Sequence, residues 1–386
     1  MKTVITAASL YTPVLSIDLP VVSIEDGCIL SIGSRAQAEV PPGARLFDFP
    51  GCILSPGFID LHIHGGAGYD VMEDNDAALT AVGLSIARHG VTGYLPTTVT
   101  ASEDKTLRAL ERLGAAVARR DETDSCARPL GIHLEGPFIS HAKRGVHPPQ
   151  DLIAPSAKML DRFWNASGGS LRMMTIAPEL PGAIETILRA TELGIHASLG
   201  HSAATYGEAR AGIDAGADHA THTFNAMRPL DHRDPGILGA ILGDRTLTAD
   251  IIVDGIHVDP AVVRIFLAAK GEDRSILITD AISATGMPDG QFSLGALTVE
   301  VRDGRCEHEG KLAGSVLTLD RAVRNVMDFA GWKLQQAIRL ASLNPATLLG
   351  SSCPAGVLAA GRPADLIALT PEGRIVRTFL AGKPVL

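Results

Sequence analysis

The segment GFIDLHIHGG, residues 57–66, governs how the rest of the chain is interpreted. Apolar residues lead into His62 and His64 and stop at a glycine pair, as in a buried strand that ends in a loop. Side chains two positions apart on a strand share one face, so both imidazoles can reach a single ion. For zinc, that ion lies about 2.0–2.1 Å from each nitrogen. Taken alone, the pair is equally consistent with two unrelated polar strand residues.

Seven further runs share this character, with apolar and β-branched residues followed by glycine or a polar residue. Together with the first run, the predicted strands are Phe58–His64, Gly93–Thr98, Pro129–Glu135, Leu171–Ala177, Ile195–His201, Ala220–Phe224, Leu247–Val253 and Ser275–Asp280. Amphipathic Ala/Leu-rich stretches lie between most of them, including 77–89, 105–120, 182–193 and 203–215. Alternating strands and helices predict an α/β fold in which eight units close into a (β/α)8 TIM-type barrel.

Both ends of the chain differ from its middle. Residues 1–55 hold short strand-like runs with turn signals and no convincing helix, and the tail repeats this character at 364–369 and 375–382. We therefore expect a small β-sandwich domain built from residues 1–55 and 355–386. The catalytic barrel is expected over residues 56–354.

Composition limits the possible partners. The 386 residues are 46% hydrophobic and 20% charged, enough for one large core and a smaller accessory unit. A formal net charge of -9, without a long Lys/Arg block, argues against nucleic acid or an anionic membrane surface. We find no signal peptide and no apolar run long enough to span a bilayer. Five scattered cysteines without a close pair fit a reduced cytoplasm.

More acidic and imidazole side chains fall at the ends of predicted strands, namely Glu135, His201, His222 and Asp280. Because the active sites of such barrels lie at the C-terminal ends of the strands, this placement predicts a hydrolytic metal centre. His219 shares a run with His222, and in an extended chain the two point to opposite faces. Only one of them can then serve, and His222 is nearer the strand end. The remaining histidines of these runs are interpreted as structural: His133, His196 and His219.

Asp280 suits proton transfer. It follows largely apolar positions, so the predicted strand aims it into the mouth of the barrel. A divalent ion lowers the pKa of bound water from 15.7 to about 7, and a neighbouring carboxylate can take that proton. The same group can return the proton to a leaving amine. The alternative is a solvated surface aspartate.

The strings GFIDLHIHG, GIHLEGPF, SLGHSAAT, HTFNAM, VDGIHV and TDAISATG resemble those of N-acetylglucosamine-6-phosphate deacetylases of the amidohydrolase superfamily. The resemblance spans nearly the whole chain, and HLEGPF together with HTFNAM is its most specific part. It implies that Glu135, His201 and His222 hold the principal metal and that Asp280 is the acid/base. His62 and His64 are both retained, so a second ion can bind, with Glu135 bridging. Zinc is the first choice for nitrogen and oxygen ligands, and iron, cobalt or manganese can substitute.

The resemblance also implies how the substrate is held. The family grips the sugar phosphate at positions that map to Asn225, the backbone of Ala226 and Arg233. A guanidinium suits phosphate because charge-assisted hydrogen bonds are stronger than neutral ones. Within this sequence alone, Arg233 would be interpreted as part of a solvated ion pair. The resemblance implies instead that it reaches a neighbouring subunit of a homodimer.

Further substrate contacts are implied at His147 and His257, which map to positions that touch the acetamido carbonyl and the sugar hydroxyls. Ala313 lies in a loop that can close over the sugar. The implied reaction is hydrolysis of the acetamido group of N-acetylglucosamine 6-phosphate to glucosamine 6-phosphate and acetate. In it, the metal and His147 stabilise the oxyanion and Asp280 carries the proton to nitrogen.

Three alternatives stay open at this point. The same reaction on N-acetylgalactosamine 6-phosphate differs at one hydroxyl, and no residue pattern separates the two epimers. An amidohydrolase acting on a cyclic amide usually carries a carboxylated lysine at the end of a mid-barrel strand. No predicted strand ends in lysine here, and Glu135 occupies the plausible place. A catalytically inactive scaffold should have lost ligands, whereas every expected position is filled.

Overall fold

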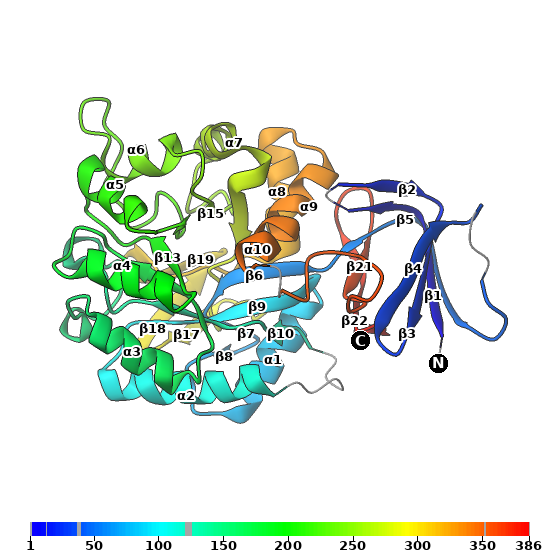
Figure 1. Cartoon of the computed structure of the whole chain (residues 1–386), viewed down its shortest axis with the longest axis horizontal. Helices are drawn as coiled ribbons and strands as arrows, with labels where there is room; N and C mark the ends of the chain where they lie inside the picture. Colours follow the sequence, from blue (N-terminus) through cyan, green and yellow to red (C-terminus); the bar gives the residue numbers. More distant parts are fainter. Residues whose placement is uncertain (1, 13, 37–39, 120–125, 351–352, 386) are drawn as a thin grey trace.

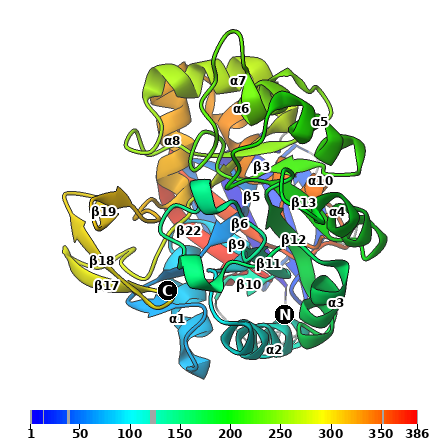
Figure 2. The ribbon, with the colours of Figure 1, turned by 90° about the vertical axis from the view of Figure 1, so that its left-hand side faces the viewer.

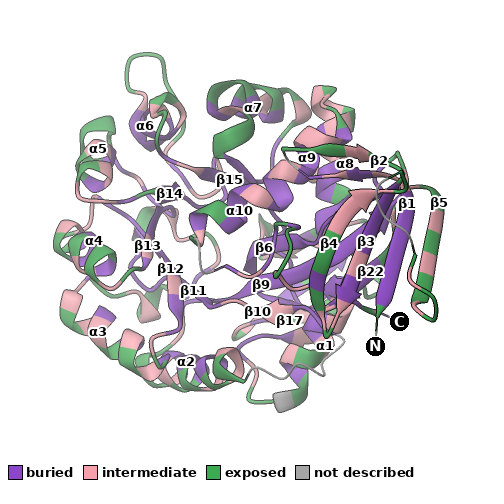
Figure 3. Ribbon diagram, turned by 45° about the vertical axis from the view of Figure 1, so that its right-hand side comes forward, coloured by how far each residue is buried: buried purple, intermediate pink, exposed green. Residues whose placement is uncertain are grey.

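Parallel strands form the centre of the larger part of the molecule (Figure 1). The computed structural model describes residues 2–12, 14–36, 40–119, 126–350 and 353–385. The parallel strands are β6 (Phe58–Ile63), β9 (Val91–Thr98), β10 (Arg128–Pro129), β11 (Ile132–Glu135), β12 (Leu171–Ile176), β13 (His196–Leu199), β14 (His219–Ala220), β15 (Ala249–Ile252) and β16 (Ser275–Ile278). They are buried along nearly their whole length, as parallel strands covered by helices are (Figure 3).

These strands follow one another around a curled sheet. The order β10-β9-β11-β12-β13-β14 forms one sheet in which β6 also pairs with β9, and β15 pairs with β16. Backbone hydrogen bonds continue between the two sets: Thr223 N donates to the Asp250 carbonyl oxygen at 2.9 Å. Asp280 N donates to the His62 carbonyl oxygen, also at 2.9 Å. The segment after the last parallel strand therefore lies beside the end of the first.

Helices surround the outside of these strands (Figure 2). They are α1 (Asp76–Ala87), α2 (Glu103–Ala118), α3 (Ala157–Ala166), α4 (Ala183–Glu192), α5 (Tyr206–Asp214), α6 (Gly236–Gly243), α7 (Pro260–Arg274), α8 (Leu319–Ala330), α9 (Leu334–Ala341) and α10 (Leu343–Leu348), with short 3-10 turns at His141–Lys143 and Pro149–Asp151. Capping residues fix where some of these helices begin: Thr205 and Glu208 form a capping box at α5, and Asp259 caps α7 ahead of Pro260. No helix within the described ranges is both long and apolar enough to cross a bilayer.

Strands from both ends of the chain build a second sheet, at the right of Figure 1. They are β1 (Thr3–Tyr11), β2 (Ser16–Asp18), β3 (Pro20–Glu25), β4 (Cys28–Ser34), β5 (Arg45–Pro56), β21 (Leu366–Leu369), β22 (Ile375–Leu380) and β23 (Lys383–Pro384). Hydrogen bonding orders them β23-β22-β21-β5-β1-β3-β4, with β2 against β1. This sheet has its own buried cluster, which includes Ile5, Val22, Leu54 and Phe379. Strand β5 continues through Gly57 directly into β6, which links the two parts.

Smaller strands lie near the ends of β6 and β16. A short pair, β7 (Gly65–Gly66) and β8 (Tyr69–Asp70), follows β6. A four-stranded antiparallel sheet follows β16: β17 (Gly290–Leu294), β18 (Leu297–Arg302), β19 (Arg305–His308) and β20 (Lys311–Leu312).

Each of the eight predicted runs contains a strand, but the sixth was wrong in its extent. Strand β14 stops at Ala220, whereas the expected run continued to Phe224. His222 and Phe224 have φ values of 29° and 81°, and an extended chain cannot contain positive φ angles. The predicted stretch 105–120 is α2, and its expected last residue, Arg120, lies outside the described residues.

Candidate metal centre

Six of the predicted ligand and acid/base side chains converge where the parallel strands end. His62 and His64 come from β6, Glu135 from the end of β11, and the others from the segments after β13, β14 and β16, namely His201, His222 and Asp280. All of them have less than a tenth of their surface exposed. Because buried ionisable groups are costly without partners, such a concentration requires a physical explanation.

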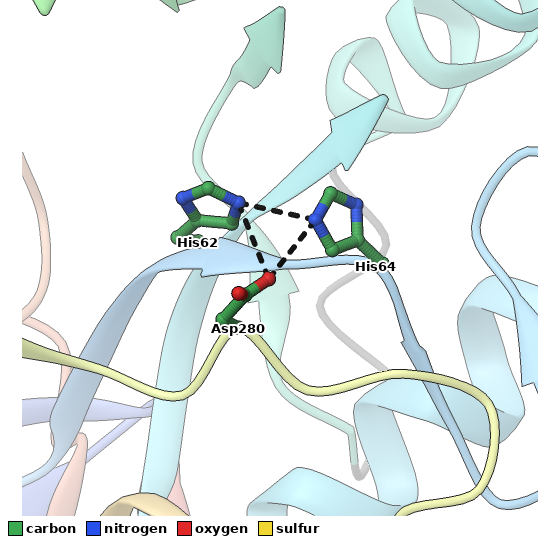
Figure 4. A group of neighbouring side chains, drawn as sticks. All are labelled: His62, His64 and Asp280. Carbon is green, nitrogen blue, oxygen red and sulfur yellow. Dashed lines mark hydrogen bonds and ion pairs between the residues drawn. The ribbon is translucent and has the colours of Figure 1, made fainter. Parts of the chain in front are cut away.

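His62, His64 and Asp280 form a first group (Figure 4). The Nε2 atoms of the two histidines lie 3.1 Å apart. Asp280 Oδ1 lies 3.1 Å from His64 Nε2 and 3.5 Å from His62 Nε2. The three side chains thus point their ligand-type atoms at a common point.

Glu135, His201 and His222 form a second group around one carboxylate oxygen. Glu135 Oε1 lies 3.2 Å from His201 Nε2 and 3.0 Å from His222 Nε2, and the two nitrogens are 3.0 Å apart. The same glutamate reaches the first group, with Oε1 3.4 Å from His62 Nε2 and Oε2 3.3 Å from His64 Nε2. Glu135 is therefore shared between both groups.

These separations, 3.0–3.5 Å, are within a few tenths of an ångström of those around a divalent ion. A four-coordinate ion with bonds of about 2.0–2.2 Å holds its ligand atoms about 3.3–3.6 Å apart. Four imidazole nitrogens and two carboxylates are also a donor set that suits zinc and other first-row metals. The residues present can therefore hold such an ion.

Ring hydrogen bonds support the same conclusion. His64 Nδ1 lies 3.0 Å from the Thr97 carbonyl oxygen, and His201 Nδ1 lies 2.9 Å from that of Lys143. A carbonyl only accepts, so Nδ1 carries the hydrogen and a neutral ring presents the Nε2 lone pair. These lone pairs face the carboxylate of Glu135, and a cation between them removes the repulsion. Metal-bound histidines are commonly oriented by this type of contact.

The other two rings, His62 and His222, lack that anchor, because each Nδ1 is buried without a hydrogen-bond partner among the described residues. Both are instead held through their backbone. His62 N donates to Asp60 Oδ1 at 3.2 Å, and His222 N donates to Asp250 Oδ1. Asp250 also contacts His219, whose Nε2 lies 2.9 Å from Oδ2. His219 is thus a structural histidine that acts behind His222.

The backbone is strained at three of these positions. His201, His222 and Asp280 have φ values of 45°, 29° and 52°. Left-handed backbone at residues other than glycine costs of order 1–3 kcal/mol and tends to occur at functional sites. It turns these side chains away from the strand direction and toward the shared point.

Both carboxylates of the site are anionic at neutral pH. Burial by itself raises the pKa of Glu135, but the charge of His62 and hydrogen bonds from His147, His201 and His222 hold that pKa well below its usual range. Burial also raises the pKa of Asp280, yet His62 and His64 outweigh it and bring it to about 2. The positive charge that offsets these buried carboxylates is supplied by protonated imidazoles or, where the rings are neutral and act as ligands, by a bound cation.

His147 lies beside the second group, with Nε2 3.6 Å from Glu135 Oε2. Glu135, His147 and His201 are close enough to form an alternative ligand group. However, His147 Nδ1 accepts the backbone N–H of Thr100 at 3.3 Å, so a neutral ring carries its hydrogen on Nε2. A nitrogen that carries hydrogen donates and does not ligate a metal. Gly136, at φ 71°, leaves room for Thr100 beside His147, because any side chain at position 136 would collide with the Thr100 hydroxyl.

The predicted substrate contacts are placed unequally. Asn225 adjoins the second group, since its Nδ2 donates to the His222 carbonyl oxygen at 3.3 Å. Ala226 follows with φ 50° and is half-buried. Arg233 lies in an exposed stretch, and its recorded contact is a backbone N–H to Asp231 Oδ1 at 2.8 Å. Within the described part of one chain, Arg233 does not join the metal groups.

The other two predicted substrate contacts, His257 and Ala313, are held in place by hydrogen bonds of their own or of nearby residues. His257 Nδ1 lies 2.6 Å from Asp254 Oδ2, which orients a ring that is mostly buried. Ala313 is buried, and two residues later Ser315 N donates to the Asp280 carbonyl oxygen at 2.8 Å. The loop that carries Ala313 is therefore directly attached to the segment of Asp280.

Sequence interpretation missed the buried residues that orient the site. Asp60 and Asp250 contact the backbone of metal-group histidines, and Thr97 and Thr100 contact imidazoles. One signal was available for Asp60, which shares a strand face with His62 two residues later. Asp250 could have been singled out as a carboxylate inside an otherwise apolar strand.

Comparison with known proteins agrees with this geometry. The sequence model of the Amidohydrolase family matches residues 53–385 of this chain. An N-acetylgalactosamine-6-phosphate deacetylase of Escherichia coli O157:H7 is 38% identical over 93% of this chain and 93% of its own. An N-acetylglucosamine-6-phosphate deacetylase of Lysinibacillus sphaericus is 35% identical, over 93% and 92%.

Solved structures give the same result. A point mutant of the N-acetyl-D-glucosamine-6-phosphate deacetylase of Mycobacterium smegmatis, in complex with N-acetyl-D-glucosamine-6-phosphate, is 36% identical, with a TM-score of 0.92. The comparison covers 100% of this chain and 99% of that one. The N-acetylglucosamine-6-phosphate deacetylase of Pasteurella multocida is 31% identical, covers 100% and 99%, and also has a TM-score of 0.92. The chain belongs to the amidohydrolase family, within the group of N-acetylglucosamine-6-phosphate deacetylases and their N-acetylgalactosamine-6-phosphate relatives.

Proposed function

We propose that this chain hydrolyses the acetamido group of N-acetylglucosamine 6-phosphate, giving glucosamine 6-phosphate and acetate. The observation that carries the proposal is the convergence of Glu135, His201 and His222 to within 3.0–3.2 Å of one another. Asp280 lies across the same small volume. The named substrates of the related proteins supply the substrate class.

The proposed cofactor is one or two divalent ions, with zinc as the first choice and iron, cobalt or manganese as substitutes. Glu135, His201 and His222 would hold the principal ion. His62 and His64 would hold a second ion, with Glu135 between the two. When bound, such an ion makes water acidic enough to lose a proton near neutral pH and polarises the substrate carbonyl.

Side chains of the protein would then transfer the proton and stabilise the developing negative charge. Asp280 accepts the proton of the attacking water and returns it to the amide nitrogen as the carbon–nitrogen bond breaks. His147 donates its Nε2 hydrogen to the carbonyl oxygen, which gains negative charge in the transition state. Thr100 fixes the His147 tautomer that this donation requires.

For substrate recognition, we propose that Asn225 and the Ala226 backbone bind the phosphate. Arg233 would join them from a second copy of the chain in a homodimer, which fits its exposed position. His257 would contact the sugar, and the loop with Ala313 would close over it.

The proposed architecture is a (β/α)8 barrel over residues 56–354 and a β-sandwich domain over residues 1–55 and 355–386. The hydrogen bonds between the ends of β6 and β16 support closure of the barrel. Separate buried clusters in the two parts support the division. We also propose a reducing cytoplasmic location, because no two cysteines of the described residues form a disulfide.

Acetate release tests the function. The purified protein, with its metal content measured first, is assayed on N-acetylglucosamine 6-phosphate, N-acetylgalactosamine 6-phosphate and both unphosphorylated sugars. We expect turnover of the first and much slower turnover of the unphosphorylated forms. Higher kcat/KM on the galactosamine epimer would favour the second candidate, which the 38% identity to the Escherichia coli enzyme supports. A metal-loaded protein that releases no acetate from either phosphate would refute the proposal.

A further inference from the structure

Asp60 is a buried carboxylate directly behind the metal groups, with 1% of its surface exposed. It lies on β6, two residues before His62, and faces no Lys or Arg within ion-pair distance in the described residues. We infer that Asp60 is a positioning residue, which sets the relative placement of His62 and Asp280. This inference rests on the proposed function, because it concerns how that site is assembled.

The first part of the argument is the orientation of His62. Its Nδ1 has no hydrogen-bond partner among the described residues, so no second contact fixes the ring in the way that Thr97 fixes His64. The backbone of His62 is held on both sides: its N–H donates to Asp60 Oδ1 at 3.2 Å, and its carbonyl oxygen accepts the N–H of Asp280 at 2.9 Å. The position of His62 Nε2 therefore depends on the backbone that Asp60 holds.

The second part is the link to Asp280, 220 residues along the chain. Asp60 Oδ1 also accepts the backbone N–H of Thr279 at 3.3 Å, and Oδ2 accepts the Thr279 hydroxyl at 2.6 Å. Thr279 directly precedes Asp280, whose φ of 52° is strained. Thr279 is also held by Ser315, whose Oγ donates to the Thr279 carbonyl oxygen at 2.6 Å.

The third part is the short junction that this carboxylate reinforces. Strands β6 and β16 do not form a continuous ladder, and a few backbone hydrogen bonds join the segments at their ends: Asp280 N donates to the His62 carbonyl oxygen, and His64 N and Gly65 N donate to that of Ala281. A buried carboxylate is an expensive way to join two strands, because apolar residues of similar volume do so without desolvating a charge. What it adds is a fixed geometry for three donors at once. A displacement of about 1 Å at a reacting group can cost roughly a hundredfold in rate.

Three variants test the inference. Asp60→Ala removes all three contacts. Asp60→Asn keeps an acceptor for both backbone N–H groups and a donor to the Thr279 hydroxyl. Asp365→Ala is the control, because Asp365 is also buried and accepts a backbone N–H, that of Ala381 at 2.8 Å, but directly precedes β21 of the other sheet and pairs with Arg128. The measurements are metal affinity by chelator competition, kcat and KM with saturating metal, and thermal unfolding.

We expect Asp60→Ala to lower metal affinity roughly tenfold or more, as loss of a group that orients ligands does. Its kcat with saturating metal should also fall at least tenfold while KM changes little, because Asp280 is displaced. Asp60→Asn should recover most of both losses. Asp365→Ala should lower the unfolding temperature and leave metal affinity and kcat within about twofold of the parent.

The result that overturns the inference is an Asp60→Ala variant with parental metal affinity and kcat, or an Asn variant as impaired as the Ala variant. Loss of stability alone, matched by Asp365→Ala, would likewise mean a purely structural role. Failure of the proposed function is a separate result, since it requires that the parent protein itself bind no metal or release no acetate.

Discussion

At the scale of single residues, Asp280 is the group to which we assign proton transfer. Its Oδ1 lies 3.1 Å from His64 Nε2, at the edge of the ligand cluster. Replacing it with asparagine keeps the shape and removes the base. We expect Asp280→Asn to bind the substrate within a few-fold of the parent and to lose roughly 10²–10⁴ in kcat. Steady-state kinetics and calorimetric binding check this, and full turnover by the variant would rule out the role.

A His147 variant can show whether this residue donates a hydrogen bond to the substrate or ligates the metal. Because Thr100 N–H occupies Nδ1, we expect His147→Phe to lose roughly 10²–10³ in kcat, the usual effect of removing one oxyanion donor. The bound metal per chain should stay at the parental value. His147→Gln, which retains an N–H donor, should recover part of the rate. A loss of metal in His147→Phe would instead support the alternative group with Glu135 and His201.

At the scale of elements, the end of α6 depends on a buried lysine. Lys270 Nζ donates to the carbonyl oxygens of Ile241 at 2.9 Å and Asp244 at 2.7 Å. Burial lowers the pKa of Lys270 to about 8, although Asp244 pulls it upward. Between about pH 8 and 10.5, the unfolded chain then holds a proton that the folded chain has released, so stability rises with pH in this window.

We expect the contribution of Lys270 to the free energy of unfolding to increase by up to about 3 kcal/mol from pH 8 to pH 10.5. Below pH 8 it should be constant, since the lysine is charged in both states. Urea unfolding of the parent and of Lys270→Met across this range isolates the effect from other titrating groups. The difference between the two curves should slope upward, and a constant difference would contradict the assignment.

Strand β14 is the element that sequence interpretation described least well. Alternation along an extended run assigned His219 and His222 to opposite faces, but the run is not extended beyond Ala220. Both histidines instead contact Asp250, one through its ring and the other through its backbone N–H. The alternation of apolar and polar residues does not reveal a turn whose positive φ angles are imposed by neighbours elsewhere in the chain.

At the scale of the whole molecule, one ion pair ties the two parts together. Arg128 of β10 donates to Asp365, which precedes β21, and the Asp365 side chain is 1% exposed. Removing the arginine leaves a buried carboxylate without its partner. We expect Arg128→Met to lower the free energy of unfolding by about 3 kcal/mol.

The control for this prediction is Arg35→Met, which breaks an Arg–Asp pair with Asp48 at 2.9 Å whose side chains are 50% and 45% exposed. Exposed pairs contribute little, so its effect should stay within about 1 kcal/mol. Denaturant unfolding of both variants provides the comparison. Equal losses would mean that Arg128 contributes no more than a surface ion pair.

Local pattern is enough to locate most of the strands and the imidazoles and carboxylates at their ends. The histidines 62 and 64 and the strand ends at Glu135 and Asp280 follow from alternation and from glycines, which act over a few residues. The contacts that orient them do not follow from such patterns. Asp60 meets Thr279 across 219 residues, and Asp250 meets His222 across 28.

Which nitrogen of His147 carries hydrogen, which carboxylate lies behind His62, and which backbone angles turn His201 and Asp280 inward are decided by the tertiary structure alone. Each depends on a partner brought near by the packing of other strands. Residue type and spacing determine what a side chain can ligate, because that is a property of its own atoms. Its direction and protonation depend on distant neighbours, because a hydrogen bond exists only where the folded chain places donor and acceptor within about 3 Å.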